Sequence, residues 1–390
     1  MECIILEPTE RIYEHDSYLF TFTGKVLDCQ PAKKKGFEVV LDRTAFFPEG
    51  GGQPADFGTL GGVKVTDCHI RENVIYHHTE EPLTVGDEVE GVIDQARRID
   101  HMEQHTGEHI LSGLLHSMYG VENVGFGISA DNVRLDCSIE LTAEQLAAAE
   151  KAANEAVRRD VPVQVLYPTD EELEKITYRN KKELEGQVRI VTIPGADTCA
   201  CCGTHVATSG QVGVIKILTS EKYKGGTRLS IACGARAWDV IAHEHDEILA
   251  ISGLLSAKPV AVDEAVARMK DELEKQKQRC AAAETHWFEA LASAVVPGER
   301  QILLMDGLSS DSLRRLCLAL GEKTDALCAV FAPGGSGLAY AMAQPGEDIR
   351  PLGKAMNAAL NGRGGGKPVL VQGSIAETDF AKVQAFFQGV

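Results

Sequence analysis

Hydrophobic and polar positions alternate in short runs over the first 95 residues. An alternation with a period of two is typical of half-buried β-strands. Glycine, proline and acidic residues separate the runs and favour turns between them. The spacing predicts a small β-barrel over residues 1–95, built from FTGKVLDCQ, KGFEVVLDR, VKVTDCHI, NVIYHH and DEVEGVIDQ.

The pattern becomes helical after the barrel. From Arg97 to about Tyr119 hydrophobic residues recur near every 3.6 positions, and Gly120 follows as a stop signal. A second helix is predicted from Thr142 to Arg159, with Thr142 as its N-cap. Four strands come next, so we expect an α+β domain with an antiparallel sheet over residues 96–240. Their sequences are VQVLYP, QVRIVTI, VGVIKILTS and TRLSIACG.

A long helical stretch is predicted over residues 241–298 as a linker, broken near Pro259. From Val262 to Trp287, core-type positions recur at spacings of four and three, which is typical of a heptad seam. Such a seam packs either as a hairpin within one chain or between two chains. The spacing alone does not separate these alternatives, and we favour a homodimer.

The last segment, residues 299–390, alternates short apolar runs with helical stretches. The runs QILLMD, ALCAVFA and PVLVQGS read as buried strands, and helices are predicted around Leu313 to Leu320 and Leu352 to Leu360. We therefore expect a small C-terminal α/β domain. Near its end lies a Gly-rich run, NGRGGGKP, which we expect to form a loop.

Composition and charge narrow the class of protein. The 390 residues include 44% hydrophobic and 25% charged side chains, as in ordinary globular proteins of two or three domains. No run approaches the roughly 18 apolar residues of a membrane span, and the N-terminus lacks an export signal, so we expect a cytoplasmic protein. The formal net charge of −18 argues against broad non-specific binding of nucleic acid, although it leaves room for a local basic patch.

Histidines and cysteines in two segments carry candidate metal chemistry. His105 and His109 stand four positions apart on the predicted helix, so both imidazoles face one side. Cys201 and His205 lie on a turn that precedes a strand. One thiolate and three imidazoles form a tetrahedral set suited to one Zn²⁺.

The thiol ligand and the role of the metal stay open at this stage. Cys199 or Cys202 could replace Cys201, because the three cysteines fall within four positions. The crowding also argues against disulfides and for a reducing compartment. A purely structural zinc is as good an interpretation as a catalytic one, because four protein ligands leave no position for water. Glu108 invites comparison with the base of HExxH proteases, but it stands at a different place in the motif.

These motifs together resemble a known family. HMEQHTGEHIL, CCGTHV, DRTAFFPEGGGQPADFG and GGTRLSIACG are similar to the editing domain of alanyl-tRNA synthetase and of its free-standing AlaX relatives. The Gly-rich tail resembles the C-terminal domain that alanyl-tRNA synthetase shares with DHH phosphoesterases. The resemblance therefore covers nearly the whole chain and matches the long AlaX type.

The resemblance implies a hydrolase that deacylates Ser-tRNA(Ala), and that also takes Gly-tRNA(Ala) as a candidate substrate. A pocket shaped for alanine rejects an added hydroxyl or a missing methyl by only about 1–3 kcal/mol, so a second site must remove the errors. Because no aminoacylation module precedes the barrel, we expect deacylation in trans and no charging of tRNA. The general base is left unassigned.

The resemblance also implies roles for individual residues. His105, His109, Cys201 and His205 would be the zinc ligands. Thr44 would contact the serine hydroxyl, or else be a strand residue bonded to backbone. Gln53 would orient the ester or a water, or else be a solvated turn residue. Substrate binding is implied for Gly50, Gly51, Gly52 and Arg228.

Basic residues are candidates for tRNA contact, against the alternative that they are solvated surface. Those that we favour are Arg179, Lys181, Lys182, Arg363 and Lys367; further candidates are Arg97, Arg98, Lys222, Lys224 and Arg228.

Three competing functions remain. The first is a non-catalytic tRNA-binding module with a structural zinc. A phosphoesterase is suggested by the tail, but the chain lacks an Asp-His-His motif. The third is a small-molecule esterase built on the same fold.

Overall fold

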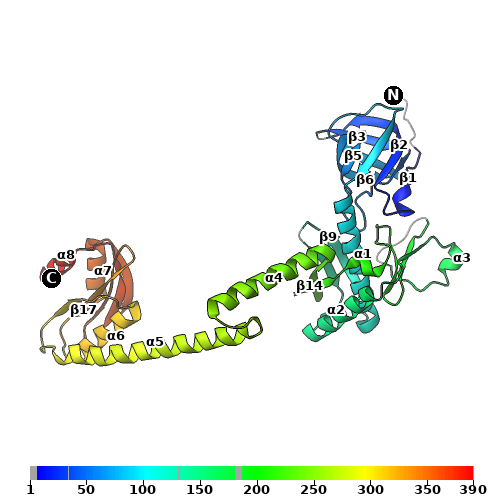
Figure 1. The fold of residues 1–390 in the computed structure, drawn as a ribbon. Helices are drawn as coiled ribbons and strands as arrows, with labels where there is room; N and C mark the ends of the chain where they lie inside the picture. The colour runs from blue at the N-terminus through cyan, green and yellow to red at the C-terminus, as the bar shows by residue number, and fades with distance from the viewer. Residues whose placement is uncertain (1–6, 34, 131, 181–186, 390) are drawn as a thin grey trace. The chain divides into compact units, whose positions relative to one another are not determined.

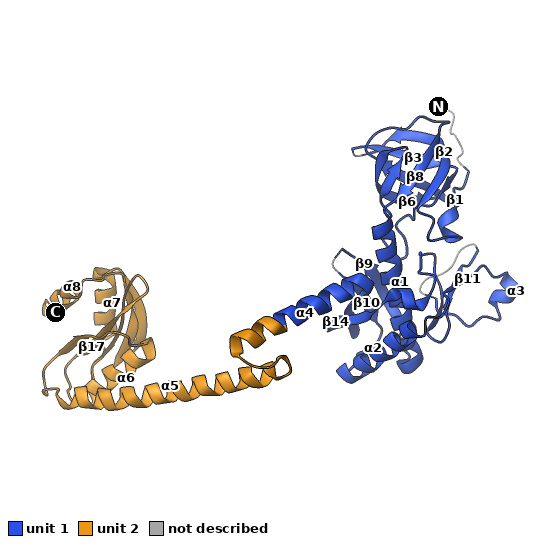
Figure 2. Ribbon diagram, in the orientation of Figure 1, with its two compact units in different colours: residues 1–247 blue, residues 248–390 orange. Residues whose placement is uncertain are grey.

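The structure is a computed structural model that describes residues 7–33, 35–130, 132–180 and 187–389. The chain divides into two compact units, residues 1–247 and 248–390 (Figure 2). The division falls inside helix α4 (Gly234–Leu255). The finer division into four domains remains a prediction.

Six strands close into a barrel at the start of the first unit, in the order β2-β3-β7-β6-β5-β8 (Figure 1). The five strands that alternation predicts are all present, and their inward side chains, among them Val39 and Leu41, form a core together with Phe46 from the segment after Thr44. The sequence pattern missed β5, whose three residues are too few to show a period. The barrel strands are β2 (Thr21–Pro31), β3 (Phe37–Leu41), β5 (Gly58–Leu60), β6 (Val63–Arg71), β7 (Val74–Thr79) and β8 (Glu88–Ile93), with β1 (Glu10–Arg11) paired to β4 (Arg43–Thr44) beside them.

Helix α1 (Gln95–Tyr119) runs from the barrel into the rest of the first unit (Figure 1). The Asp94 side chain caps its start by accepting from the backbone N–H of Arg97. Gly120 ends it in the left-handed region, at φ 68°, where a residue with a Cβ would be strained. The helix and its C-terminal stop are as the sequence predicts.

Two antiparallel sheets and helix α2 (Ala143–Arg158) surround α1. One sheet has the order β14-β15-β10-β9 and the other β11-β12-β13. Thr142 and Gln145 form a capping box at the start of α2, which confirms the predicted N-cap. The α+β expectation is confirmed for this part. Its remaining elements are β9 (Asn123–Ile128), β10 (Val133–Cys137), β11 (Gln164–Leu166), α3 (Asp170–Leu173), β12 (Ile190–Ile193), β13 (Asp197–Ala200), β14 (Ile215–Tyr223) and β15 (Gly226–Cys233).

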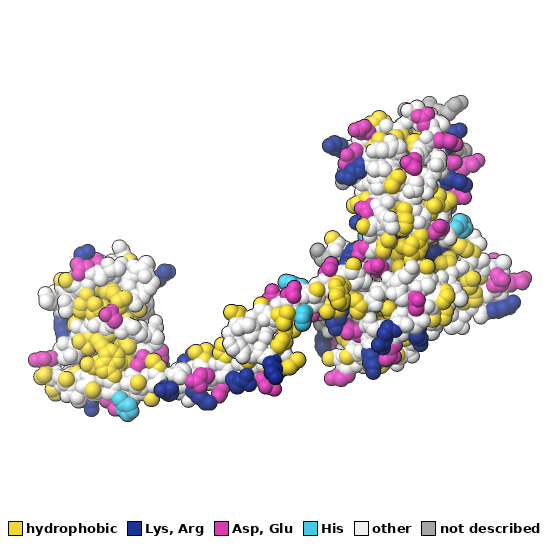
Figure 3. All heavy atoms as spheres, in the orientation of Figure 1, with side chains coloured by type: hydrophobic (Ala, Val, Ile, Leu, Met, Phe, Trp, Pro, Cys, Tyr) yellow, Lys and Arg dark blue, Asp and Glu magenta, His cyan; other side chains and the backbone are white. Residues whose placement is uncertain are grey.

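The second unit contains the long helix α5 (Val262–Ser293), which carries the predicted seam. Met269 and Leu273, two of its apolar positions, are 54% and 56% exposed. Figure 3 shows hydrophobic side chains at the surface of this helical segment. Within the described residues, these two positions of the seam are therefore solvent-exposed.

A five-stranded sheet with the order β16-β17-β18-β20-β19 forms the rest of the second unit. Only β16 and β17 pair in parallel, so the expectation of an α/β domain is wrong and the tail is mainly antiparallel. Buried apolar runs do not encode strand direction, and the sequence pattern did not reveal the hairpin partner β18. The Gly-rich run, expected as a loop, is the edge strand β19. The elements are β16 (Gln301–Leu304), α6 (Ser310–Gly321), β17 (Cys328–Gly334), β18 (Gly337–Ala343), α7 (Arg350–Ala359), β19 (Gly362–Lys367), β20 (Leu370–Ile375) and α8 (Phe380–Gln388).

No helix in the described ranges combines the length and the apolar character that crossing a membrane requires.

Candidate metal centre

Three imidazoles and one thiol meet in the first unit. Helix α1 supplies His105 and His109 from adjacent turns, and the segment after β13 supplies Cys201 and His205. Their ligand atoms all lie within 4.8 Å of one another. Cys201 Sγ is 3.5 Å from His105 Nε2 and 3.4 Å from His205 Nε2. The four residues named from the sequence therefore converge on one point.

The donor set fits a zinc ion. Zinc binds thiolate at about 2.3 Å and imidazole at about 2.0 Å, so a tetrahedral site places sulfur and nitrogen about 3.5 Å apart. The two sulfur–nitrogen separations match that value. All four side chains are at least partly buried, as expected of a site that holds its ligands in place.

Each imidazole is oriented by a different partner at Nδ1. His105 Nδ1 donates to Gln53 Oε1 over 2.8 Å, and His109 Nδ1 donates to Asp197 Oδ2 over 2.8 Å. His205 Nδ1 lies 3.1 Å from the hydroxyl of Thr106. With Nδ1 engaged in this way, Nε2 of each ring is the atom left to bind a metal.

Asp197 is itself held by an arginine. Arg179 donates from Nε to Oδ1 over 2.7 Å and from Nη2 to Oδ2 over 2.8 Å. Burial acts to raise the pKa of Asp197, but the hydrogen bonds from His109 and Arg179 outweigh it and bring the pKa to about 2. Asp197 thus remains an anion that fixes both the tautomer and the angle of the His109 ring.

The geometry selects Cys201 from the three neighbouring cysteines. Burial acts to raise the pKa of its thiol, but the imidazoles of His105, His109 and His205 outweigh burial and hold the pKa well below its usual value. Cys199 belongs to a second group, with His109 and Asp197. A cation there would compete with Arg179 for the carboxylate, so the first group is the better metal site.

The backbone around Cys201 is shaped to approach His105. Arg189 Nη1 donates to the carbonyl oxygens of Cys201 and Gly203, over 2.8 and 2.9 Å. A Cβ on Gly203 would collide with the imidazole of His105. The absence of a side chain at Gly203 therefore lets this turn lie against the helix.

A cavity of about 420 Å³ opens beside the metal ligands. Its walls include His105, His109 and Cys201, together with Arg189 and the ring of Phe126. Phe126 stacks on His105 with 5.0 Å between ring centroids. The cavity has room for part of a small organic ligand, which would lie beside the four clustered side chains.

Comparison with known proteins places the chain in a family. It is 33% identical over 399 residues to the alanyl-tRNA editing protein Aarsd1 of Mus musculus, covering 96% of each chain. It is 33% identical to the Rattus norvegicus protein of the same name, again over 96% of each chain. The chain belongs to the alanyl-tRNA editing protein family.

Further matches agree with this family assignment. The alanine–tRNA ligase of Pyrococcus abyssi is 32% identical over 97% of this chain, which spans 43% of that enzyme. The family model described as the threonyl and alanyl tRNA synthetase second additional domain matches residues 188–230, which include Cys201 and His205. The model for class II (A) tRNA synthetases matches residues 12–97, the region of the barrel.

Two of the three glycines that the editing resemblance assigned to substrate binding line the cavity. Gly51 and Gly52 are wall residues, with φ at 60° and 90°. A Cβ on Gly52 would press on Phe126 and its backbone. Gly50 instead pairs with Gln53 across the tight turn, and it is not a wall residue of the described cavity.

The structure places Thr44 inside the barrel rather than at the cavity. Its hydroxyl is fully buried, 2.8 Å from His77 Nε2, and accepts from the backbone N–H of Phe46. Among the described residues, it is not part of the cavity wall. This placement agrees with the alternative, a strand threonine bonded within the barrel, and the contact with a serine hydroxyl stays a prediction. Whether Thr44 can bind a substrate hydroxyl depends on the direction of its side chain, which a sequence motif does not reveal.

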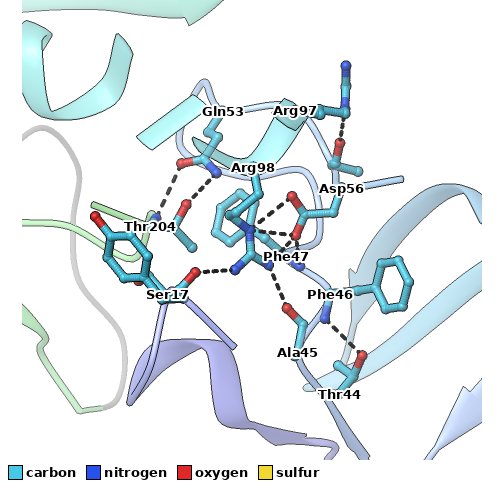
Figure 4. Close-up of polar contacts among 12 residues, drawn as sticks. Ser17, Thr44, Ala45, Phe46, Phe47, Gln53, Asp56, Arg97, Arg98 and Thr204 are labelled. Carbon is cyan, nitrogen blue, oxygen red and sulfur yellow. Dashed lines mark hydrogen bonds and ion pairs between the residues drawn. The ribbon is translucent and has the colours of Figure 1, made fainter. Parts of the chain in front are cut away.

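Gln53 also differs from expectation. Its Nε2 donates to Thr204 Oγ1 over 2.9 Å (Figure 4). Its Oε1 accepts from His105. The amide is buried and bonds to protein on both sides. Gln53 therefore orients the imidazole of His105 and is not a solvated turn residue, while a role towards an ester stays a prediction.

Several candidate basic residues have partners within the protein. Arg228 makes two hydrogen bonds to Asp136 and lies over the ring of Tyr223, away from the described cavity wall. Arg179 is largely buried against Asp197, so it is not an exposed cation. These contacts assign both arginines internal roles that the sequence did not predict.

Two neighbouring arginines of α1 also point inward. Arg98 is fully buried on Asp56, and Arg97 stacks on Phe57 while donating to a backbone carbonyl. The expected exposure is wrong for Arg98, because the barrel packs on this end of the helix, whereas Arg97 is half-buried.

The remaining basic candidates are either exposed or lie outside the residues that the structure describes. Arg363 and Lys367 are exposed on β19, and Lys222 pairs with Glu140 at the surface. Lys224 lies 5.1 Å from the ring of Tyr223. Lys181 and Lys182 lie outside the described residues. On the face shown in Figure 3, Lys and Arg side chains of the first unit are interspersed with Asp and Glu.

Sequence reasoning missed the residues that position the ligands in this editing-family protein. Asp197, Thr106 and Thr204 have ordinary positions in the sequence, and only folding brings them to His109, His205 and Gln53. The one available signal was the place of Asp197, four residues before Cys201 on a short strand. Glu108 is buried, accepts from Asn123 over 2.6 Å, and is not among the described residues of the cavity wall.

Proposed function

We propose that this protein hydrolyses the ester of mischarged Ser-tRNA(Ala) in trans, and that Gly-tRNA(Ala) is a second substrate. The observation that carries the proposal is the cluster of three oriented imidazoles and one thiol beside a 420 Å³ cavity. Membership of the alanyl-tRNA editing family supports tRNA(Ala) as the partner.

One Zn²⁺ per chain is the proposed cofactor, held by His105, His109, Cys201 and His205. A bound zinc would supply positive charge that polarises or positions the aminoacyl ester. Gln53, Asp197 and Thr106 keep the three rings aligned, so that little reorganisation accompanies substrate binding.

The cavity walls would hold the esterified nucleotide. Gly51 and Gly52 leave the wall without side chains, so that a flat base or ribose can approach the backbone there. Phe126 offers an aromatic face at the same wall. Exposed Arg363 and Lys367 on β19 are proposed to contact tRNA phosphates; replacing both with alanine should weaken tRNA binding and reduce its dependence on salt.

The assembly and the compartment complete the proposal. The exposed apolar positions of α5 would form a homodimer seam, as the heptad spacing predicts. We place the protein in the reducing cytoplasm, because Cys201 must remain a thiolate to bind zinc.

Single-turnover hydrolysis tests the function. The native protein should deacylate Ser-tRNA(Ala) much faster than Ala-tRNA(Ala), and His105→Ala or Cys201→Ala should slow it by about 100-fold or more. His116→Ala is the matched control, a partly exposed histidine on the same helix and outside the ligand group. Survival of Ser-tRNA(Ala) in the presence of zinc-loaded native protein would favour the tRNA-binding module.

A further inference from the structure

A buried ion pair joins the start of helix α1 to the loop that carries Gln53. Both side chains, Arg98 and Asp56, are 0% exposed. Arg98 Nε donates to Asp56 Oδ1 and Oδ2, over 3.1 and 3.0 Å, and Nη2 also donates to Oδ2. Figure 4 shows the guanidinium at the centre of these contacts. A buried fork of this kind fixes the carboxylate in distance and in angle.

The same guanidinium reaches two further segments. Nη2 donates to the carbonyl of Ala45 over 2.6 Å, and Nη1 donates to the carbonyl of Ser17 over 2.9 Å. Asp56 in turn accepts from the backbone N–H of Phe47 over 2.6 Å. Arg98 thus binds both ends of the segment from residue 45 to residue 56.

Gln53 lies within that segment, and His105 lies two turns along α1 from Arg98. The loop and the helix meet again where Gln53 Oε1 accepts from His105 Nδ1 over 2.8 Å. Arg98 holds the two ends of the loop against the start of the helix. Further along the same helix, Gln53 from this loop contacts His105, a proposed metal ligand. A shift of the loop by 1 Å would lengthen or misalign this bond.

We propose that the Arg98–Asp56 pair is a positioning pair for the metal centre, which acts through Gln53 on the orientation of His105. The inference rests on the proposed metal site and is independent of deacylation. It gives the buried charges a role beyond stability, for which a well-packed apolar pair would often serve equally well.

Cobalt binding tests the proposal. Co²⁺ replaces Zn²⁺ in tetrahedral thiolate and imidazole sites, and its visible absorption reports on ligand geometry. We would titrate the full-length native protein, Gln53→Ala and the double variant Arg98→Met/Asp56→Asn with Co²⁺. The double variant removes both charges, so no uncompensated buried ion is left to unfold the barrel.

The double variant should bind Co²⁺ about 10- to 100-fold more weakly than the native protein, with a shifted spectrum that resembles that of Gln53→Ala. Adding Gln53→Ala to the double variant should weaken Co²⁺ binding little further, because both changes act through one contact. The matched control is Arg236→Lys. Arg236 makes two hydrogen bonds to Asp100, which lies on α1 as Arg98 does. This control should leave the Co²⁺ affinity and the spectrum unchanged.

Two results would overturn the proposal. A folded double variant with native affinity and spectrum would show that the pair only stabilises the barrel. Effects that add fully to those of Gln53→Ala would show that the pair does not act through Gln53. Loss of deacylation without these changes bears on the proposed function alone, and failure of the native protein to bind Co²⁺ would overturn the metal centre together with this inference.

Discussion

Asp197 affects the metal centre through two side chains at once. It accepts from His109 and is held by Arg179 from the opposite side. Asparagine at this position keeps one acceptor oxygen but loses the charge and one of the contacts to Arg179.

We expect Asp197→Asn to weaken zinc binding by about 10- to 100-fold, because the partner that orients a ligand histidine also raises its basicity. Competition with a coloured chelator measures the affinity. Asp100→Asn is the control, since Asp100 lies on α1, the helix that carries His109, but pairs with Arg236. Equal zinc affinity in Asp197→Asn and the native protein would refute this role.

His77 predicts a pH dependence of stability. The ring is fully buried in the barrel, with Nδ1 donating to the Val39 carbonyl over 3.1 Å and Nε2 beside the Thr44 hydroxyl. Burial lowers its pKa from 6.5 to about 4, so it stays neutral when folded. The unfolded chain binds the extra proton between pH 6.5 and 4. Stability from this group is therefore complete above pH 6.5 and is lost as the pH falls towards 4.

Between pH 7 and pH 5 the native protein should lose about 2 kcal/mol more unfolding free energy than a His77→Gln variant. Urea unfolding at the two pH values measures the difference. Other histidines titrate in both proteins, so the comparison isolates His77. Identical losses in the two proteins would show that His77 is not held neutral.

Among the secondary-structure elements, those with strong periodicity were predictable and those without it were not. Helix α1 shows its hydrophobic period, its cap and its glycine stop in the sequence. In β9, Val124, Phe126 and Ile128 alternate with Gly125 and Gly127, and glycine is more typical of turns than of strands, so the pattern was not recognised as a strand. The glycine run of β19 hid an edge strand in the same way.

Some residues of the candidate site were also predictable from the sequence, and others were not. Histidines spaced by four and a Cys-x₃-His turn are typical of zinc sites, so the four candidate ligands that the structure brings together were named from the sequence. The motif around Thr44 and Gln53 places residues near the site but does not determine where each side chain points. Arg98, Asp197 and Arg179 depend on contacts 18 to 88 residues apart, which one sequence does not reveal.

In the turn that carries Cys201, adding a single methyl group at Gly203 should disturb the metal centre. Gly203→Ala should weaken zinc binding at least 10-fold, because the added Cβ would collide with the His105 ring. Chelator competition provides the measurement. Gly253→Ala, a helix position with no neighbour near its Cβ, is the control and should bind zinc normally. Normal zinc binding by Gly203→Ala would contradict the described approach of the turn.

For the whole molecule, the exposed seam of α5 predicts the state of assembly. Light scattering at micromolar concentration should find a dimer, and Met269→Lys together with Leu273→Lys should convert it to a monomer by placing charge in an apolar interface. The variant should retain its zinc, because the ligands lie in the other unit. A native monomer would contradict the proposed seam.

Zinc dependence of catalysis is the central claim, and it can be measured directly. Protein freed of metal by dialysis would be reloaded with increasing amounts of Zn²⁺, and single-turnover hydrolysis of Ser-tRNA(Ala) followed at each step. We predict that the hydrolysed fraction rises in proportion to bound zinc and reaches its maximum at one zinc per chain. Full hydrolysis by folded, zinc-free protein would contradict the account.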